Sequence, residues 1–112
     1  MDTPFLNILV AKDTPHSQRH YIIKTASQKQ FKGLLELVYN LLYGNIPTSQ
    51  KTINTLKPHK KLVDRLLSPT VSLTKKQRLL ANRYDILLVL LKALQPFLEE
   101  NEVHEEVLSG SE

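Results

Sequence analysis

Residues 27–47 read SQKQFKGLLELVYNLLYGNIP, and they carry the local signals that start, continue and end an amphipathic helix. Ser27 and Gln30 have the spacing of a capping box, in which the serine side chain accepts a hydrogen bond from a free amide at the helix start. Gly44 occupies the position after a helix where the left-handed conformation is common, and Pro47 follows it. The apolar residues between these ends recur at steps of three and four: Phe31, Leu34, Leu35, Val38, Leu41 and Leu42. This pattern predicts a helix over about 27–43.

Helical spacing of apolar residues resumes after Pro47, but Pro58 interrupts it. A proline lacks an amide hydrogen and disfavours the helical conformation of the residue before it. We therefore expect two short helices, over about 49–57 and 59–68, that meet at a kink or tight turn.

A longer helix is expected over about 73–98, with Ser72 or Thr74 as its N-cap. Pro96 is expected to distort its final turn. The apolar stripe of this helix is wide, as is typical of the central helix of a bundle or of an oligomer interface. The candidates for such a protein interface are Ile86, Leu87, Leu90, Leu91 and Leu94.

The two ends of the chain are less regular. Residues 1–26 contain short apolar runs broken by Pro4 and Pro15, and neither run is long enough to predict an element. Residues 99–112 read EENEVHEEVLSGSE, a charge-rich composition that predicts a flexible, disordered tail. The sequence therefore predicts an all-α protein with three parts. These are an irregular N-terminal arm over 1–26, a small bundle of three to five helices over 27–98, and an acidic tail over 99–112.

The composition is that of one soluble domain of 112 residues without cysteine. A chain without cysteine cannot form disulfides or thiolate metal sites, and an intracellular, reducing compartment is the simpler expectation. The N-terminus has an acid, Asp2, where a signal peptide needs basic residues. The longest apolar run, residues 86–91, is far shorter than the roughly 20 residues of a membrane-spanning helix.

Residue patterns typical of catalysis are missing from the sequence. The acids outside the tail are few, and no two in the helical region have a spacing that would face them across a cleft. There is no glycine-rich phosphate loop and no G-x-S-x-G motif. His16 and His20 are four residues apart, but only Asp13 nearby could add a ligand, so we expect no metal site. The sequence predicts a non-enzymatic protein without a cofactor.

The charge is unevenly distributed along the chain. Residues 48–83 contain nine Lys and Arg and one acid, Asp64, whereas residues 97–112 contain six Glu and no base. Surface helices usually interleave Glu with Lys, so a basic run with one acid predicts a polyanionic partner. No aromatic residue interrupts the run, which disfavours the stacking of single-stranded bases and favours contact with the backbone of duplex DNA. The expected phosphate contacts are Lys51, Lys57, Lys60, Lys61, Arg65, Lys75, Lys76, Arg78 and Arg83.

Two further expectations concern this basic segment. Lys60 with Lys61, and Lys75 with Lys76, follow predicted helix starts, where free amides and lysine side chains could converge on a phosphate. The acidic tail is expected to compete with DNA for the same surface at a high effective concentration.

Residues 37–80 also resemble a known module. The similarity lies in three motifs: the GNIP box of Gly44, Asn45, Ile46 and Pro47; His59-Lys60-Lys61; and Val71-Ser72-Leu73 followed by Lys75-Lys76. These are similar to a short basic module of Maverick/Polinton-type DNA elements and related adintoviruses, which itself resembles the adenovirus small core peptide. The resemblance implies DNA packaging in a virion core or mobile element, and localisation to the nucleus or the virion.

Three alternatives remain open at this point. The basic segment could form a helix-turn-helix, with 59–68 as its first helix and SLTKKQR, residues 72–78, beginning the recognition helix. The leucine-rich face of residues 79–98 could instead make the chain an interaction module for a partner helix or a second copy. An interfacial membrane binder would use the same two features but would need anionic lipid.

Overall fold

The computed structural model describes the backbone of residues 3–110 and the side chains of residues 4–99. The helices are α1 (Thr3–Val10), α2 (His16–Thr25), α3 (Gln28–Leu42), α4 (Gln50–Leu56), a short 3₁₀ helix η1 (Lys57–His59), α5 (Lys60–Leu67), α6 (Leu73–Ala81) and α7 (Tyr84–Gly110). No strand occurs in residues 3–110, so the predicted all-α class is confirmed. Five of the α-helices, α3 to α7, begin within 27–98, as predicted for the bundle.

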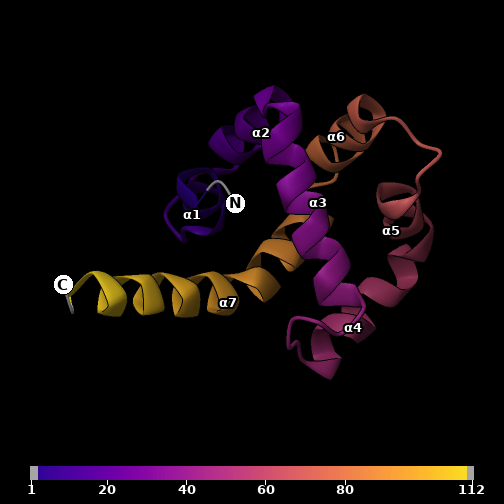
Figure 1. Cartoon of the computed structure of the whole chain (residues 1–112). Coiled ribbons are helices and arrows are strands. Elements are labelled where there is room, and N and C mark those ends of the chain that lie inside the picture. Colours follow the sequence, from indigo (N-terminus) through magenta and orange to yellow (C-terminus); the bar gives the residue numbers. More distant parts are fainter. Residues whose placement is uncertain (1–2, 111–112) are drawn as a thin grey trace.

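Helix α3 is drawn through the middle of the molecule in Figure 1, with α1 and α2 on one side of it and α5 on the other. Helix α4 lies beside the C-terminal end of α3. Helix α6 packs against α2 and against α3, near the N-terminal end of α3. Helix α7 packs against α1, α3, α4 and α6, and its second half then extends away from the other helices (Figure 1). The acidic end of the chain therefore points away from α5.

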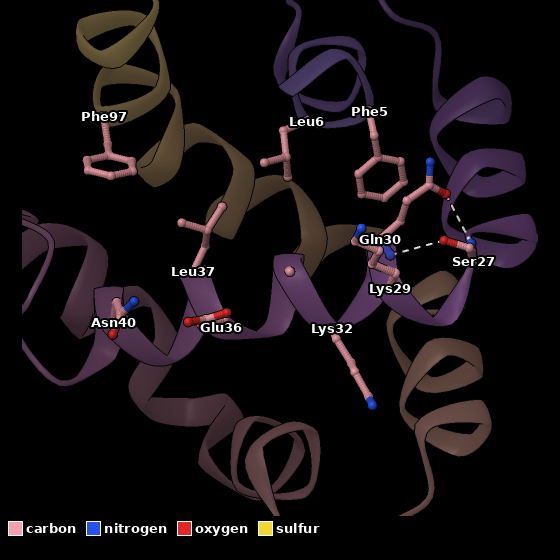
Figure 2. Close-up of a pocket in the computed structure, with 11 residues that line it drawn as sticks. Phe5, Leu6, Ser27, Lys29, Gln30, Lys32, Glu36, Leu37, Asn40 and Phe97 are labelled. Atoms are coloured by element: carbon pink, nitrogen blue, oxygen red, sulfur yellow. Dashed lines mark hydrogen bonds between the residues drawn. The ribbon is translucent and has the colours of Figure 1, made fainter. Parts of the chain in front are cut away.

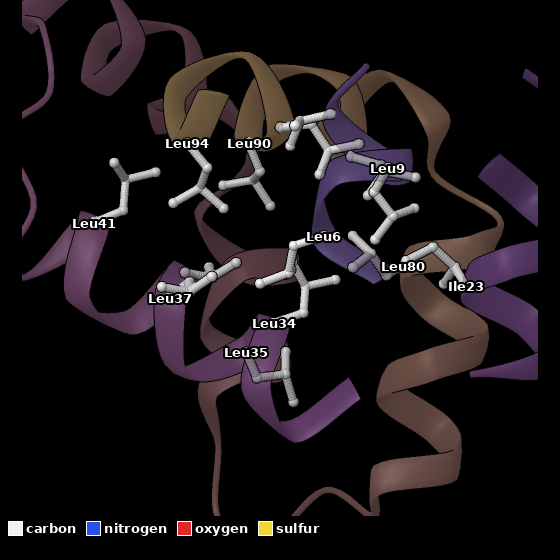
Figure 3. Close-up of a cluster of buried hydrophobic side chains, with 14 of the residues drawn as sticks. Leu6, Leu9, Ile23, Leu34, Leu35, Leu37, Leu41, Leu80, Leu90 and Leu94 are labelled. Carbon is white, nitrogen blue, oxygen red and sulfur yellow. The ribbon is translucent and has the colours of Figure 1, made fainter. Parts of the chain in front are cut away.

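The core lies where α1, α3 and α7 meet (Figure 3). Helix α3 contributes one side of it, and α7 contributes the facing side, because both helices repeat leucine at helical spacing. Ile23 of α2 and Leu80 of α6 lie at one end of it (Figure 3), and Leu56 of α4 and Leu66 of α5 also belong to it. Its fully buried members include Leu6, Leu9, Ile23, Leu34, Leu41, Leu80, Leu90 and Leu94.

Helix α3 begins and ends as the sequence predicts. Ser27 and Gln30 form the capping box, since the Gln30 amide donates to Ser27 Oγ at 3.1 Å and the Ser27 amide donates to Gln30 Oε1 at 3.0 Å. Gly44 has a φ of +82°, and the following Asn45 amide donates to Asn40 O at 2.8 Å. This is the Schellman arrangement that ends helices at a left-handed residue.

The kink predicted at Pro58 is confirmed. Helix α4 passes into η1 at Lys57, and α5 follows directly at Lys60. Pro58 lies inside η1, where the tighter turn accommodates its missing amide hydrogen.

The irregular N-terminal arm predicted over 1–26 is wrong, because most of it forms α1 and α2. In α1, Phe5, Leu6, Leu9 and Val10 fall on one face and are buried. An eight-residue helix is unstable in isolation, and packing against α7 supplies the stabilisation that local propensity does not.

A buried arginine connects this N-terminal region to the bundle. Arg19 is 6% exposed, and its Nε donates to Leu9 O at 2.7 Å. Its Nη2 donates to Ala11 O, and its Nη1 donates to Tyr84 Oη at 3.0 Å. Both carbonyls lie at the C-terminal end of α1, where a cation is favoured by the helix dipole. The ring of Tyr84 also stacks on His16, with 3.6 Å between ring centroids.

The single helix predicted over 73–98 is also wrong, because the structure divides it at Asn82 and Arg83 into α6 and α7. The break allows α6 to pack on α2 while α7 packs on α1 and α3, which one straight helix could not do. Helix α7 continues through Pro96 to Gly110 instead of ending at 98. The structure describes the backbone of residues 99–110 as the second half of α7, and the flexibility predicted for this acidic tail stays a prediction.

Candidate nucleic-acid interface

Eight of the nine basic residues predicted to contact phosphate lie on the four consecutive elements α4, η1, α5 and α6, and Arg83 lies between α6 and α7. Helices α4, α5 and α6 are short, and each buries only one or two side chains, such as Val63 and Leu66 in α5. Helical periodicity therefore directs most of the remaining side chains to solvent. Lys51, Lys57, Lys60, Lys61, Arg65, Lys75 and Arg78 are exposed, and Lys76 and Arg83 are half-buried. We call these nine residues the basic surface.

Some members of the basic surface lie close together, whereas Lys51 lies farther away. Helices α5 and α6 pack against each other, and Arg83 Nη2 lies 3.4 Å from His59 Nδ1 of η1. Lys51 is more distant, because α4 and α6 lie near opposite ends of α3 (Figure 1). Fifteen helical residues span about 22 Å, so the two ends of α3 near which α4 and α6 lie are about that far apart.

Two members of the basic surface have carboxylate partners. Lys60 Nζ lies 2.7 Å from Asp64 Oδ2, with side chains 79% and 60% exposed, and Arg83 Nη2 lies 3.1 Å from Asp85 Oδ2. Exposed ion pairs of this kind contribute little to stability and are screened by salt. The other seven members form no ion pair with a carboxylate among side chains 4–99. Most of the positive charge is therefore available to an external anion.

The two ion pairs shift the pKa of Lys60, Arg83 and Asp85. The hydrogen bond from Arg83 is the main cause that lowers the pKa of Asp85 below its ordinary value, and the Ile86 amide adds to it. The hydrogen bond to Asp64, and then the charge of Asp64, raise the pKa of Lys60 above its ordinary value. Both shifts favour the charged forms, so these residues stay ionised near neutral pH.

Free amides and lysine side chains at two helix starts are predicted to converge on a phosphate. This prediction is wrong for the amides of Lys60, Lys75 and Lys76, because these amides already have partners. The Lys60 amide donates to Lys57 O, because η1 leads into α5 without a free helix start. At α6, Ser72 and not Thr74 is the N-cap, and its Oγ accepts from the Lys75 amide at 3.2 Å. The Lys76 amide donates to Ser72 O at 3.0 Å. Phosphate contact at these residues therefore falls to the side chains.

A hollow of about 420 Å³ lies between α2 and α6. Gln77 Nε2 holds the two helices together by donating to Ile23 O and Ala26 O, at 2.8 and 3.0 Å. The residues around the hollow are polar or basic except Ala81: His20, Lys24, Thr74, Gln77, Arg78, Ala81 and Asn82. It brings Lys24 and His20 beside Arg78, which extends the basic surface onto α2.

The sequence contains no local signal for this extension, since more than 50 residues separate Lys24 from Arg78. Each of the two histidines of α2 also has a partner on another helix. His20 Nδ1 donates to Ala81 O at 2.8 Å, whereas His16 stacks on Tyr84. The two rings therefore have different partners, and no group of three potential metal ligands occurs among the described residues.

The protein interface predicted on the last helix is wrong. Ile86, Leu87, Leu90, Leu91 and Leu94 are each at most 2% exposed, because α7 buries them against the other helices of the same chain. The wide apolar stripe thus reflects a central position in the bundle. It leaves these five side chains unavailable to a partner.

A second hollow, of about 870 Å³, lies on another side of α3, against α1 and α7 (Figure 2). Phe5, Leu37 and Phe97 give it apolar walls, and Lys29 and Glu36 lie at its rim. None of the nine members of the basic surface lines it. Within the part of the chain that the structure describes, no helix has the length and apolar character needed to cross a membrane.

Comparison of the chain with protein-family models, curated proteins and solved structures found no match. The similarity of residues 37–80 to the mobile-element module therefore stays a prediction.

Proposed function

We propose that this protein binds duplex DNA without sequence preference, through the phosphate backbone and the basic surface. The observation that supports this most is the excess of positive charge on α4, η1, α5, α6 and the following Arg83, where seven of nine basic side chains have no carboxylate partner among residues 4–99. Electrostatic contact of this kind supplies most of the affinity in non-specific DNA binding.

The dimensions of the basic surface agree with a duplex ligand. Helices α4 and α6 lie near opposite ends of α3, whose length of about 22 Å corresponds to about six or seven base pairs at 3.4 Å per step. Long, exposed lysine and arginine side chains adapt to phosphate positions without reading base edges, so weak sequence preference is expected. In the helix-turn-helix alternative, residues 72–78 begin the recognition helix. That alternative would require side chains of α6 to contact base edges.

The dependence of affinity on salt tests this proposal. If five to seven members of the basic surface neutralise phosphates, the slope of log affinity against log salt is about −5 to −6 for a duplex. A slope near zero, or no binding at low salt, would contradict the proposal.

A matched pair of variants locates the contact. Lys61→Gln with Arg65→Gln removes two exposed charges from α5 and should reduce the size of the slope by about 2. Lys12→Gln with Lys29→Gln removes two exposed charges outside the basic surface and should leave the slope nearly unchanged. Equal effects of the two double variants would show that net charge, and not this surface, determines binding.

The biological setting follows from the resemblance of residues 37–80. If it holds, the DNA is the genome of a virus or mobile element, and the protein acts in a virion core or in the nucleus.

A further inference from the structure

Two exposed tyrosines stack on each other at the C-terminal end of α3. Tyr39 is 48% exposed and Tyr43 is 65% exposed, and their ring centroids are 4.4 Å apart with 29° between the ring planes. The spacing of four residues places both rings on one face of the helix. Each ring covers one face of the other, and the exposure of both side chains leaves part of each tyrosine open to solvent.

The end of α3 keeps this pair accessible. Gly44 turns the chain into the left-handed conformation directly after Tyr43, and Ile46 is buried two residues later. The chain therefore leaves the helix axis, and no further helical turn covers the Tyr43 ring.

The pair lies at the C-terminal end of α3, beside which α4, the first helix of the basic surface, lies (Figure 1). Helix α3 also packs against α5. The charge of Tyr43 also raises the pKa of Lys60 of α5, as the last of its causes after Asp64 and desolvation.

We propose that Tyr39 and Tyr43 form a stacking site for an unpaired nucleobase, beside the phosphate contacts of Lys60 and its neighbours. Aromatic rings with an open face next to a basic groove are the elements with which proteins hold single-stranded nucleic acid. The phosphate on the chain of the stacked base then falls near Lys60. This inference rests on the proposed function, because the site needs the basic surface to hold the strand.

The site changes the expected ligand range. The basic run from 48 to 83 contains no aromatic residue, so the sequence favours duplex DNA alone. Folding brings two aromatic rings from α3 to the edge of that run. The protein should therefore bind single strands, or duplexes with unpaired ends, through a contact that a blunt duplex does not make.

Affinities for two ligands test the site: a thymidine oligonucleotide and a blunt duplex of the same length, at the same salt concentration. Tyr39→Leu with Tyr43→Leu should weaken binding of the single strand roughly 10- to 100-fold and leave the duplex affinity unchanged. Tyr39→Phe with Tyr43→Phe should retain the single-strand affinity, because stacking uses the ring face and not the hydroxyl. Tyr21→Leu, on α2 and 66% exposed, is the matched control and should change neither affinity.

The fluorescence of the protein gives an independent readout. The chain has four tyrosines and no tryptophan, so its emission reports the tyrosines directly. A stacked base should quench the emission of the wild type and of Tyr21→Leu, but not that of the double leucine variant.

Each outcome separates this inference from the proposed function. If the wild type binds the duplex with the expected salt slope but the double leucine variant keeps its single-strand affinity, the stacking site is refuted and duplex binding stands. If the wild type binds neither ligand, both proposals fail. Equal losses for both ligands, or a change in the mass of the free protein in sedimentation, would also refute the stacking site. A change in the mass of the free protein would identify the tyrosines as a protein interface.

Discussion

Replacing Arg19 by methionine tests the connection between α1, α2 and α7. Methionine has a similar length and no polar head, so it can occupy the same space but cannot donate to Leu9 O, Ala11 O or Tyr84 Oη. The variant leaves three acceptors without their donor in a site that is 6% exposed in the wild type.

The magnitude follows from these three bonds. A hydrogen bond to a charged group contributes about 1.5 to 3 kcal/mol, and a buried acceptor left without a donor costs about 1 to 3 kcal/mol. Part of this loss is offset because a buried guanidinium without a carboxylate partner is itself costly to desolvate. We expect a net loss of about 2 to 4 kcal/mol in the free energy of unfolding. For 112 residues this lowers the melting temperature by about 8 to 16 °C.

Urea denaturation followed by far-ultraviolet circular dichroism measures this loss. Arg19→Lys should fall between the wild type and Arg19→Met, because an ammonium group cannot reproduce the planar fork of the guanidinium. Lys24→Met, an exposed position on the same helix, should stay within about 0.5 kcal/mol of the wild type. An Arg19→Met variant as stable as Lys24→Met would show that α1 and α2 are held by apolar packing alone.

Two further predictions concern the glycines of α3 and the acidic tail. An added Cβ meets no atom within 4 Å at Gly33 or Gly44, so only backbone conformation should matter: Gly33→Ala should stabilise by about 0.5 to 1 kcal/mol, and Gly44→Ala, at a φ of +82°, should destabilise by about 1 to 2 kcal/mol. Thermal denaturation distinguishes the two, and shifts of the same sign would contradict the conformational argument. Deletion of 99–112 removes six glutamates and should tighten duplex binding severalfold at low salt and much less at high salt. Equal affinities of the full-length and truncated chains at low salt would exclude competition by the tail.

Much of the bundle was predictable because its signals are local. The capping box of Ser27, the stripe of α3 and the left-handed Gly44 all act within one or two turns of helix. The same holds for Pro58, whose missing amide hydrogen affects its immediate neighbours. The outward position of most of the basic surface also follows from helical periodicity, since the apolar residues of α5 and α6 define the buried face.

The errors arose where distant segments determine the structure. Arg19 lies in a polar segment and has the appearance of a surface residue, yet carbonyls of α1 and the hydroxyl of α7 surround it. The division of 73–98 at Asn82 accompanies the packing of α6 on α2. Asn82 is the C-cap of α6, and asparagine is common at helix ends, but a single asparagine within a long apolar stripe is a weak signal.

Within this protein the sequence alone determined the helical class, the ends of α3 and the excess of positive charge between 48 and 83, because each depends on residues close together in the chain. Only the tertiary structure decided that the leucines of α7 are internal and that Lys24 lines the same hollow as Arg78. Each of these depends on which helices pack together. That choice is made by apolar surface buried between segments far apart in sequence, and no local pattern specifies the partner.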